Sequence, residues 1–228
     1  MADLTKNWDD YVVHAEEIAR TAGFQDLRDR ILQTARPEEP DVVVDVGSGT
    51  GLLTLELAPR VAQVWAIDIA PAMGEYLRAK AASAGLDNVE VATASAVSLP
   101  LVDASADLVV SNYCFHHLDD DGKIRALAEV RRVLRPGGRL VFGDMMFRVG
   151  VAHPRDREVI AAKVRAMAAK GPAGFLRLAK NGVRFASRRW EHPAPAAWWR
   201  AALDDAGFSD VQVQELDHEG GVASGSLT

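Results

Sequence analysis

The glycine-rich segment Asp45-Val46-Gly47-Ser48-Gly49-Thr50-Gly51 constrains this 228-residue chain more than any other stretch. It overlaps the end of the run Val42–Val46, whose β-branched residues are typical of a strand buried on both faces. Apolar residues between positions 52 and 58 predict a helix that ends near Pro59. Glycine lets a chain turn sharply and lets a ligand approach the backbone where a Cβ atom would block it. We therefore expect residues 45–51, called the glycine loop below, to form a ligand-binding turn between a strand and a helix.

The spacing of these glycines excludes two common nucleotide sites. Dinucleotide-binding turns have the pattern G-x-G-x-x-G, but here the third glycine comes one residue early and position 52 is Leu. A phosphate-binding loop of the G-x-x-x-x-G-K-[ST] kind needs a lysine, and none comes after Gly51. The glycine loop is therefore expected to bind a ligand other than a pyrophosphate.

Strands and helices alternate along the rest of the chain, separated by turns rich in Pro and Gly. The predicted strands span residues 42–46, 64–68, 89–92, 108–111, 139–143 and 211–216, with a short partner at 221–224. The predicted helices cover residues 8–22, 26–35, 71–85, 120–134, 155–169 and 193–206. Pro136-Gly137-Gly138 is expected to stop a helix and to form the turn before the fifth strand. This alternation predicts an α/β fold with a mostly parallel sheet and helices on both faces.

The composition limits where such a protein works. One cysteine, Cys114, permits no internal disulfide and fits a reducing compartment. The longest run without Asp, Glu, Lys or Arg is 12 residues, 91–102, which is too short to cross a bilayer. The N-terminus lacks the basic-then-apolar layout of a secretory signal. These features predict a soluble, cytoplasmic protein.

The net charge of −6 conceals two regions of opposite sign. Between Gly150 and His192 there are 10 Lys or Arg against 3 Asp or Glu, a local charge of +7, whereas the remainder holds 16 against 29, a charge of −13. An acidic protein argues against nucleic acid as a partner. The basic segment within it requires a separate explanation.

In its central part the chain resembles the class I S-adenosylmethionine-dependent methyltransferases of the small-molecule type. The resemblance covers about residues 42–144 and rests on the glycine loop, Asp68, Ala94–Pro100, Asp107–Ser111, His116–Leu118 and Arg132–Gly138. It implies S-adenosylmethionine as the cofactor and a Rossmann-like, seven-stranded, mostly parallel sheet with helices on both faces and a helical lid. It also implies a single methyltransferase domain over residues 1–228. The parts of that domain would be an N-terminal helical cap (1–36), a cofactor-binding core (41–146), a basic substrate lid (147–207) and C-terminal strands (208–228).

The resemblance also indicates which residues bind the cofactor. They are Tyr11, Asp45, Gly47, Ser48, Gly49, Gly51, Asp68, Ile69, Ser95, Ala96 and Asn112. The glycine loop would wrap the methionine part, Asp68 would accept hydrogen bonds from both ribose hydroxyls, and Ile69 would pack on the adenine. The simpler alternatives are a tight turn for the glycines, a helix cap for Asp68, and for Tyr11 an aromatic that only docks its helix on the sheet. The family usually carries Asp where this chain has Ser95, whose hydroxyl offers one weaker hydrogen bond, so affinity is lower or a neighbouring backbone group makes the contact.

Three residues are candidates for catalysis: His116, His117 and Asp144. A sulfonium carries its methyl group already activated, so alignment supplies most of the rate and a base is needed only for an acceptor that must lose a proton. The two histidines come after the fourth strand, at the sheet edge where open α/β folds bind ligands, and one of them is expected to act as a base or to orient the acceptor. The alternative is that His117 packs against the cofactor and His116 is a solvated loop residue. Asp144 ends the fifth strand and either faces the acceptor or caps the next turn.

The residues from Ser111 to His117 do not match the patterns of a metal site, of a cysteine nucleophile or of an enzyme that methylates nucleic acids. His116 and His117 are adjacent and not spaced to converge on a metal from one helix face, so no metal site is expected. Cys114 comes after Tyr113, whereas C5-pyrimidine methyltransferases place Pro before their nucleophile, so a buried structural thiol is predicted. The Pro-Pro-aromatic run of enzymes that methylate amino groups of nucleic acids is absent from Ser111–Cys114.

The basic segment suggests the acceptor. It mixes apolar and aromatic residues with arginines and lysines, which suits a hydrophobic or aromatic small molecule, methylated at oxygen, with nitrogen or carbon left open. The alternatives are transient contact with an anionic membrane surface to reach a lipid or quinone, a solvated helical face, and a protein that binds S-adenosylmethionine without methyl transfer. Arg outnumbers Lys, which suggests a GC-rich bacterial gene and a role in specialised metabolism.

Overall fold

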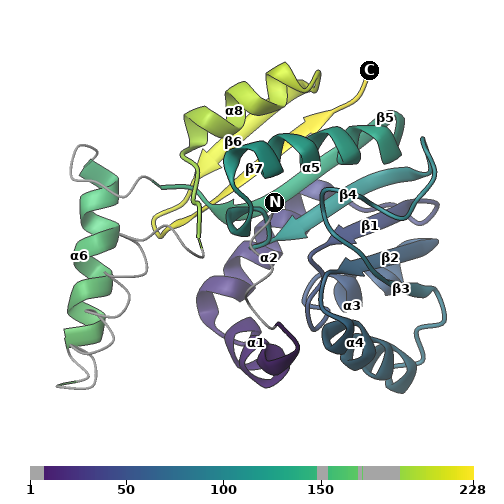
Figure 1. Ribbon diagram of the computed structural model, residues 1–228, viewed down its shortest axis with the longest axis horizontal. Coiled ribbons are helices and arrows are strands. Elements are labelled where there is room, and N and C mark those ends of the chain that lie inside the picture. The colour runs from purple at the N-terminus through teal and green to yellow at the C-terminus, as the bar shows by residue number, and fades with distance from the viewer. Residues whose placement is uncertain (1–7, 148–153, 169–170, 172–190) are drawn as a thin grey trace.

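A seven-stranded sheet forms the centre of the protein, in the order β3-β2-β1-β4-β5-β7-β6 (Figure 1). The computed structural model describes residues 8–147, 154–168, 171 and 191–228. The strands are β1 (Val42–Val46), β2 (Gln63–Asp68), β3 (Val89–Thr93), β4 (Ala106–Asn112), β5 (Leu134–Met145), β6 (Ser209–Glu215) and β7 (Gly220–Ser226). All pairs among β1 to β5 are parallel, and β7 runs antiparallel to both β5 and β6. The predicted α/β fold with a mostly parallel, seven-stranded sheet is confirmed.

Helices cover both faces of this sheet. They are α1 (Val12–Ala19), α2 (Ala22–Ala35), α3 (Thr54–Leu57), α4 (Pro71–Ser83), α5 (Asp120–Val133), α6 (Pro154–Ala168) and α8 (Ala196–Asp205). Short 3₁₀ turns occupy Trp8–Tyr11, Ala58–Arg60 and Phe115–His117. The start of α5 shows how local sequence sets these elements: the Asp119 side chain accepts a hydrogen bond from Gly122 N at 2.7 Å, and acidic residues fill the first turn while arginines fill the last.

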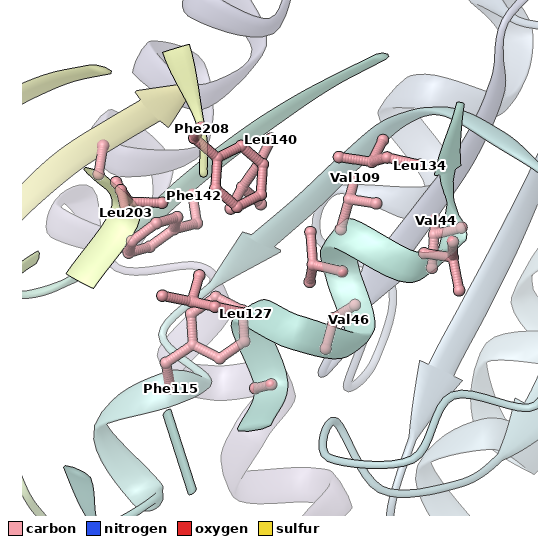
Figure 2. Close-up of a cluster of buried hydrophobic side chains, with 14 of the residues drawn as sticks. Val44, Val46, Val109, Phe115, Leu127, Leu134, Leu140, Phe142, Leu203 and Phe208 are labelled. Atoms are coloured by element: carbon pink, nitrogen blue, oxygen red, sulfur yellow. The ribbon is translucent and has the colours of Figure 1, made fainter. Parts of the chain in front are cut away.

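Alternating side chains in the central strands build one apolar core on each face. On one face, Val43 and Leu108 pack with α2 and α3. On the other, Val44 and Val109 pack with α5 and α8, and Figure 2 shows this second core. Neighbouring residues such as Val43 and Val44 therefore serve opposite faces, which explains why the β1 sequence is apolar without interruption.

Several element predictions were wrong in their bounds; for example, α1 ends at Ala19 and α2 begins at Ala22 and not at residue 26. The helix expected over residues 52–58 is only α3, because the chain needs residues 51–53 to leave the glycine loop and because Pro59 confines residues 58–60 to a 3₁₀ turn. The fifth strand begins at Leu134 and not at Arg139. Leu134 pairs with Ala106, and the register then shifts before Arg139 pairs with Leu108, so Pro136-Gly137-Gly138 is an irregularity within the strand. The hydrogen bonds of Gly137 N and Leu227 N to the opposing main chain satisfy this irregular stretch.

The strand order reverses between β1 and β4, so the carboxyl ends of these neighbouring strands open into the crevice where this fold class binds ligands.

Helix α6 stands apart from the sheet at the left of Figure 1. Arg155 in its first turn donates hydrogen bonds to the main-chain carbonyls of Met146, Leu216, His218 and Gly220. Most of the aromatic and basic side chains of the predicted lid, from Phe175 to Trp190, lie outside the described residues, so the acceptor surface predicted there stays a prediction.

Candidate active site

The glycine loop leaves β1 through three residues with positive φ: Gly47 at 73°, Gly49 at 51° and Gly51 at 93°. A Cβ atom on Gly47 would lie 2.4 Å from Cys114 Sγ, and one on Gly51 would lie 2.3 Å from a Leu77 methyl group. A Cβ atom on Gly49 would meet nothing within 4 Å. Protein packing therefore requires glycine at two of these positions, and at the third the side where a Cβ atom would lie is open space that a ligand can approach.

Asp68 joins the glycine loop to the next helix. Its Oδ2 accepts a hydrogen bond from Gly49 N at 2.8 Å, and its Oδ1 accepts one from Ala70 N at 2.9 Å, directly before α4. Asp68 therefore does bind the main chain at the start of α4, as the helix-cap alternative proposed. A carboxylate has about four lone-pair sites, so accepting these two hydrogen bonds does not exclude ligand hydroxyls. The structure brings Asp68 and the open peptide of Gly49 together at the carboxyl ends of β1 and β2.

Asp45 is buried beneath the glycine loop, and its Oδ2 accepts a hydrogen bond from the Thr54 hydroxyl at 2.6 Å. Burial raises the pKa of Asp45 to about 7, and the nearby Asp68 carboxylate adds to the increase while Thr54 opposes it. Asp45 therefore supports the loop from inside. Its carboxyl group titrates near neutral pH.

Two buried polar side chains near the glycine loop have no hydrogen-bond partner within the described part of the chain. They are the hydroxyl of Ser48, in the loop, and both amide atoms of Asn112, at the end of β4. Val46 pairs with Ser111 across β1 and β4, so the next residues along the chain, Gly47 and Asn112, leave the sheet from adjacent strands. An unsatisfied buried polar group costs about 1–3 kcal/mol, and a polar ligand that hydrogen-bonds to it offsets that cost. This arrangement fits a ligand with amino and carboxylate groups.

Residues 94–100, which the family resemblance places at the edge of the adenine, are held in place by contacts from α5. Arg132 donates to the carbonyl oxygens of Leu99 and Leu101, and Glu129 accepts from Leu99 N. The Ser95 hydroxyl lies 3.4 Å from Val97 N, within its own turn, and Ser95 and Ala96 are half-buried. Ile69, expected to pack on the adenine, is 41% exposed. An exposed apolar side chain beside Asp68 leaves a surface on which a planar ring can pack.

His116 and Asp144 form a buried pair. His116 Nδ1 lies 2.6 Å from Asp144 Oδ1, and the two residues are 4% and 1% exposed. Asp144 also accepts hydrogen bonds from His116 N at 3.0 Å and Met145 N at 2.6 Å. A carboxylate that accepts from these main-chain donors can only accept from the ring as well, so Nδ1 carries a proton and, in the neutral imidazole, Nε2 is the acceptor. The expectation that His116 could be a solvated loop residue is wrong, because its imidazole is buried against Asp144.

His117 packs against aromatic rings on two sides. Its ring centroid lies 3.9 Å from that of His116 and 4.7 Å from that of Trp8, in the N-terminal 3₁₀ turn. Tyr11, predicted to close the cofactor site, has ring contacts with Trp8 and His14. Of these two aromatic residues, Trp8 and not Tyr11 therefore contacts the loop that carries His116 and His117. Sequence reasoning missed it, although it stands one helical turn before Tyr11.

Cys114 is half-buried, with its sulfur directed at Gly47. Burial raises the pKa of the Cys114 thiol, and the carboxylates of Asp68 and Asp144 raise it further, so the thiolate is disfavoured. The neighbouring Tyr113 has φ of 53°, a rare conformation for a residue with a side chain, and its ring lies 4.4 Å from that of Phe24. After this strained turn, the Cys114 side chain points at Gly47, and His116 N donates a hydrogen bond to Asp144.

The described part of the chain offers neither a metal cluster nor a membrane-spanning helix. Among the described residues, no group of three or more His, Cys, Asp and Glu side chains is arranged to hold a metal ion. Within that same part, no helix combines the length and the apolar character needed to cross a bilayer.

The core of the chain matches a known family model. The model described as a methyltransferase domain matches residues 43–138. The chain is 34% identical over 143 residues to an uncharacterized methyltransferase of Geobacillus kaustophilus, covering 63% of this chain and 61% of that protein. It is 32% identical over 149 residues to one of Anoxybacillus flavithermus, covering 64% and 67%. It spans between 54% and 61% of the first three curated relatives that it matches.

Another relative carries a more specific name, and a solved structure shares the fold. The chain is 42% identical over 131 residues to a malonyl-[acyl-carrier protein] O-methyltransferase of Hahella chejuensis, which covers 55% of this chain and 44% of that protein. A SAM-dependent methyltransferase from Aquifex aeolicus superposes with a TM-score of 0.66 at 20% identity, over 95% of this chain and 98% of that one. At that identity the likeness shows a common fold.

Proposed function

The chain belongs to the class I S-adenosylmethionine-dependent methyltransferases, and we propose that it transfers the methyl group of this cofactor to an oxygen atom of a small hydrophobic or aromatic molecule. The observation that supports oxygen as the acceptor atom is the buried His116–Asp144 pair. A hydroxyl must lose its proton as it attacks, whereas many other acceptors need no base. A base held in one orientation by a carboxylate is an arrangement suited to that task.

The cofactor supplies a methyl group activated by a positively charged sulfur. Ser48, the open main chain of Gly49 and Asp68 are the groups that would hold it, with Asn112 completing the polar lining at the end of β4. Ile69 and the Ser95–Ala96 turn would enclose its base. The hydroxyl of Ser48 and the amide of Asn112 support this assignment. Burying these polar groups without a hydrogen-bond partner costs free energy, and a bound ligand that supplies the partner offsets that cost.

The acceptor would be bound beside His116. Asp144 holds the imidazole with Nδ1 protonated, so Nε2 can take the proton of an acceptor hydroxyl. His117 and Trp8 form an aromatic pair next to this base, a surface suited to a planar or apolar acceptor. Residues 147–207 are proposed to cover the acceptor as a lid, of which α6 and the segment from Glu191 onward are described.

A carboxylate is the second candidate for the acceptor oxygen. It is favoured by the relative named as a malonyl-[acyl-carrier protein] O-methyltransferase. A carboxylate is already ionised at neutral pH and attacks without a base. The two candidates therefore differ in whether His116 is needed.

Matched panels of acceptors test this proposal. Purified protein, methyl-labelled cofactor and aromatic compounds that carry either a hydroxyl or a carboxyl group on the same ring would be incubated from pH 6 to pH 9. We expect label on the hydroxyl series, and we expect His116→Gln to reduce that transfer by about 10²- to 10⁴-fold, the range for a general base. His14→Gln is the control, because the His14 side chain is 60% exposed on α1, and it should retain most of the rate. Transfer only to carboxylates, unaffected by His116→Gln, would favour the second candidate, and transfer to neither series by protein that binds the cofactor would contradict both.

A further inference from the structure

Helix α1 is only weakly attached to the rest of the protein by apolar packing. None of its side chains is buried. A pocket of about 160 Å³, open to solvent, lies beside α1 and the glycine loop, and its lining comes from α1, α2, α3, α4 and the loop itself. Because α1 has no buried side chain of its own, polar contacts carry more of its attachment.

One carboxylate of α1 makes the main polar contact. Glu16 Oε2 lies 3.0 Å from Lys80 Nζ of α4, and Glu16 Oε1 lies 3.2 Å from Arg20. The Glu16 side chain is 18% exposed and that of Lys80 is 31% exposed, so both are partly removed from solvent. Burial by itself raises the pKa of Glu16, but the hydrogen bonds from Lys80 and the Thr50 side chain outweigh it and lower the pKa. The carboxylate is therefore bound as an anion.

Lys80 connects this contact to the cofactor loop. Its ammonium also donates to the main-chain carbonyl of Thr50, at 3.1 Å. Thr50 lies between Gly49 and Gly51, both with positive φ, so the loop has little conformational preference of its own at this point. An external donor on the Thr50 carbonyl fixes the orientation of the peptide that joins Thr50 to Gly51.

The same N-terminal segment reaches the acceptor side. Trp8 packs edge-on against the ring of His117, which in turn contacts His116. Residues 8–20 are called the N-terminal cap below; they are only part of the segment 1–36 that was predicted as a helical cap. They therefore touch the loop of His116 and His117 at one end and the glycine loop at the other.

We propose that Glu16 and Lys80 are positioning residues that couple the N-terminal cap to the glycine loop, so that cofactor binding and docking of the cap occur together. The proposal rests on the proposed function, because it takes the glycine loop as the cofactor site. In the absence of this contact the loop retains its glycines and Asp68. It then has one fewer restraint on the Thr50 peptide, and the cap loses its charged partner on α4.

Calorimetric titration with S-adenosylhomocysteine tests the coupling. The variants are Glu16→Gln, Lys80→Met and the double variant, with Glu17→Gln as the matched control because Glu17 is a neighbour on the same helix with a side chain 73% exposed. We expect each single variant to bind about three- to tenfold more weakly, which is the range for a partly buried charge-assisted hydrogen bond. The double variant should be no weaker than the weaker single variant, because both remove one shared contact. Glu17→Gln should match the wild type.

A second measurement separates positioning from loss of stability. Chymotrypsin cleavage after Trp8 and Tyr11 would be followed with and without S-adenosylhomocysteine, alongside the melting temperature of each unliganded variant. We expect the ligand to protect the cap of the wild type and of Lys80→Arg, which keeps a donor, and to leave the cap of Glu16→Gln and Lys80→Met unprotected at an unchanged melting temperature. Equal affinity and equal protection in wild type and variants would overturn the coupling. A folded wild type that gives no binding heat would instead overturn the proposed cofactor site.

Discussion

The cofactor half and the acceptor half of the candidate site are built in different ways. The cofactor half uses main-chain geometry: three glycines with positive φ and a carboxylate on Gly49 N, all within residues 45–68. The acceptor half uses side chains, with His116 and Asp144 28 positions apart and Trp8 supplied by the N-terminal turn. Main-chain geometry restricts the residue type at each position, whereas a side-chain pair depends on the fold that brings its members together. A substitution in the acceptor half should therefore reduce methyl transfer without weakening cofactor binding, and a substitution in the cofactor half should leave the His116–Asp144 pair intact.

The largest expected effect is on the acceptor half alone. In Asp144→Asn, the new amide can donate to His116 Nδ1, which favours the tautomer with Nε2 protonated and unable to accept a proton. We expect methyl transfer to a hydroxyl acceptor to fall by about 10²- to 10⁴-fold. The Kd for S-adenosylhomocysteine should change by less than about twofold, since Asp144 is not among the residues assigned to the cofactor. Steady-state rates and calorimetry would check this, and a parallel loss of cofactor binding would show that the two halves are not separate.

The next effect is on the main chain of the cofactor half. Gly47→Ala places a methyl group 2.4 Å from Cys114 Sγ and should destabilise the protein by about 2–4 kcal/mol. Gly49→Ala is the control, because the added methyl meets open space and costs only about 1–2 kcal/mol for the positive φ. Urea unfolding measures both. Equal losses of unfolding free energy would contradict the assignment of Gly47 to packing and of Gly49 to ligand access.

Per pH unit, a smaller effect concerns the pH dependence of stability. The pKa of Asp45 is raised from 3.8 to about 7 in the folded protein, so between these values the folded state binds more protons than the unfolded state. Stability should therefore fall as pH rises from about 4 to about 7, by up to about 1.4 kcal/mol per pH unit from this group. Asp45→Asn should flatten that decline in urea unfolding series. An unchanged slope would mean that Asp45 is ionised at little cost in the folded protein.

The smallest effect is on the adenine edge. Ser95→Asp restores the residue that the family usually carries there, and a carboxylate accepts a hydrogen bond about twice as strongly as a hydroxyl. We expect the affinity for S-adenosylmethionine to rise by about 1 kcal/mol, which calorimetry would detect as a change in Kd. A decrease in affinity would indicate that the turn from Ser95 to Ser98 needs the hydroxyl for its own hydrogen bonding.

The contrast between the halves also explains what the sequence could predict. The strand β1, the glycine loop and Asp68 were predictable, because a doubly buried parallel strand needs an unbroken apolar run and a left-handed turn needs glycine. The seven-stranded, mostly parallel sheet was predictable from alternating elements and from the family resemblance. These features are local, so a short stretch of sequence carries them.

The acceptor half was predictable only as a set of candidate residues. His116 and Asp144 could each be named from their places after β4 and β5, but no local pattern indicates that Asp144 holds the imidazole. Trp8 and the Glu16–Lys80 contact join elements far apart in the chain, and a tryptophan or an ion pair gives no sign of its partner in the sequence. The length of β5 was missed for a related reason, because Pro136-Gly137-Gly138 predicts a turn unless distant main-chain partners satisfy it.

Calorimetric titration of the wild type and of Asp68→Ala with S-adenosylhomocysteine tests the central claim most directly. We expect saturable heat with the wild type. In Asp68→Ala we expect a loss of about 1.5–3 kcal/mol in binding free energy, because that carboxylate supports the Gly49 peptide and is proposed to accept hydrogen bonds from the ligand. Absence of binding heat in folded wild-type protein, or equal affinity in Asp68→Ala, would contradict the assignment of this glycine loop to the cofactor.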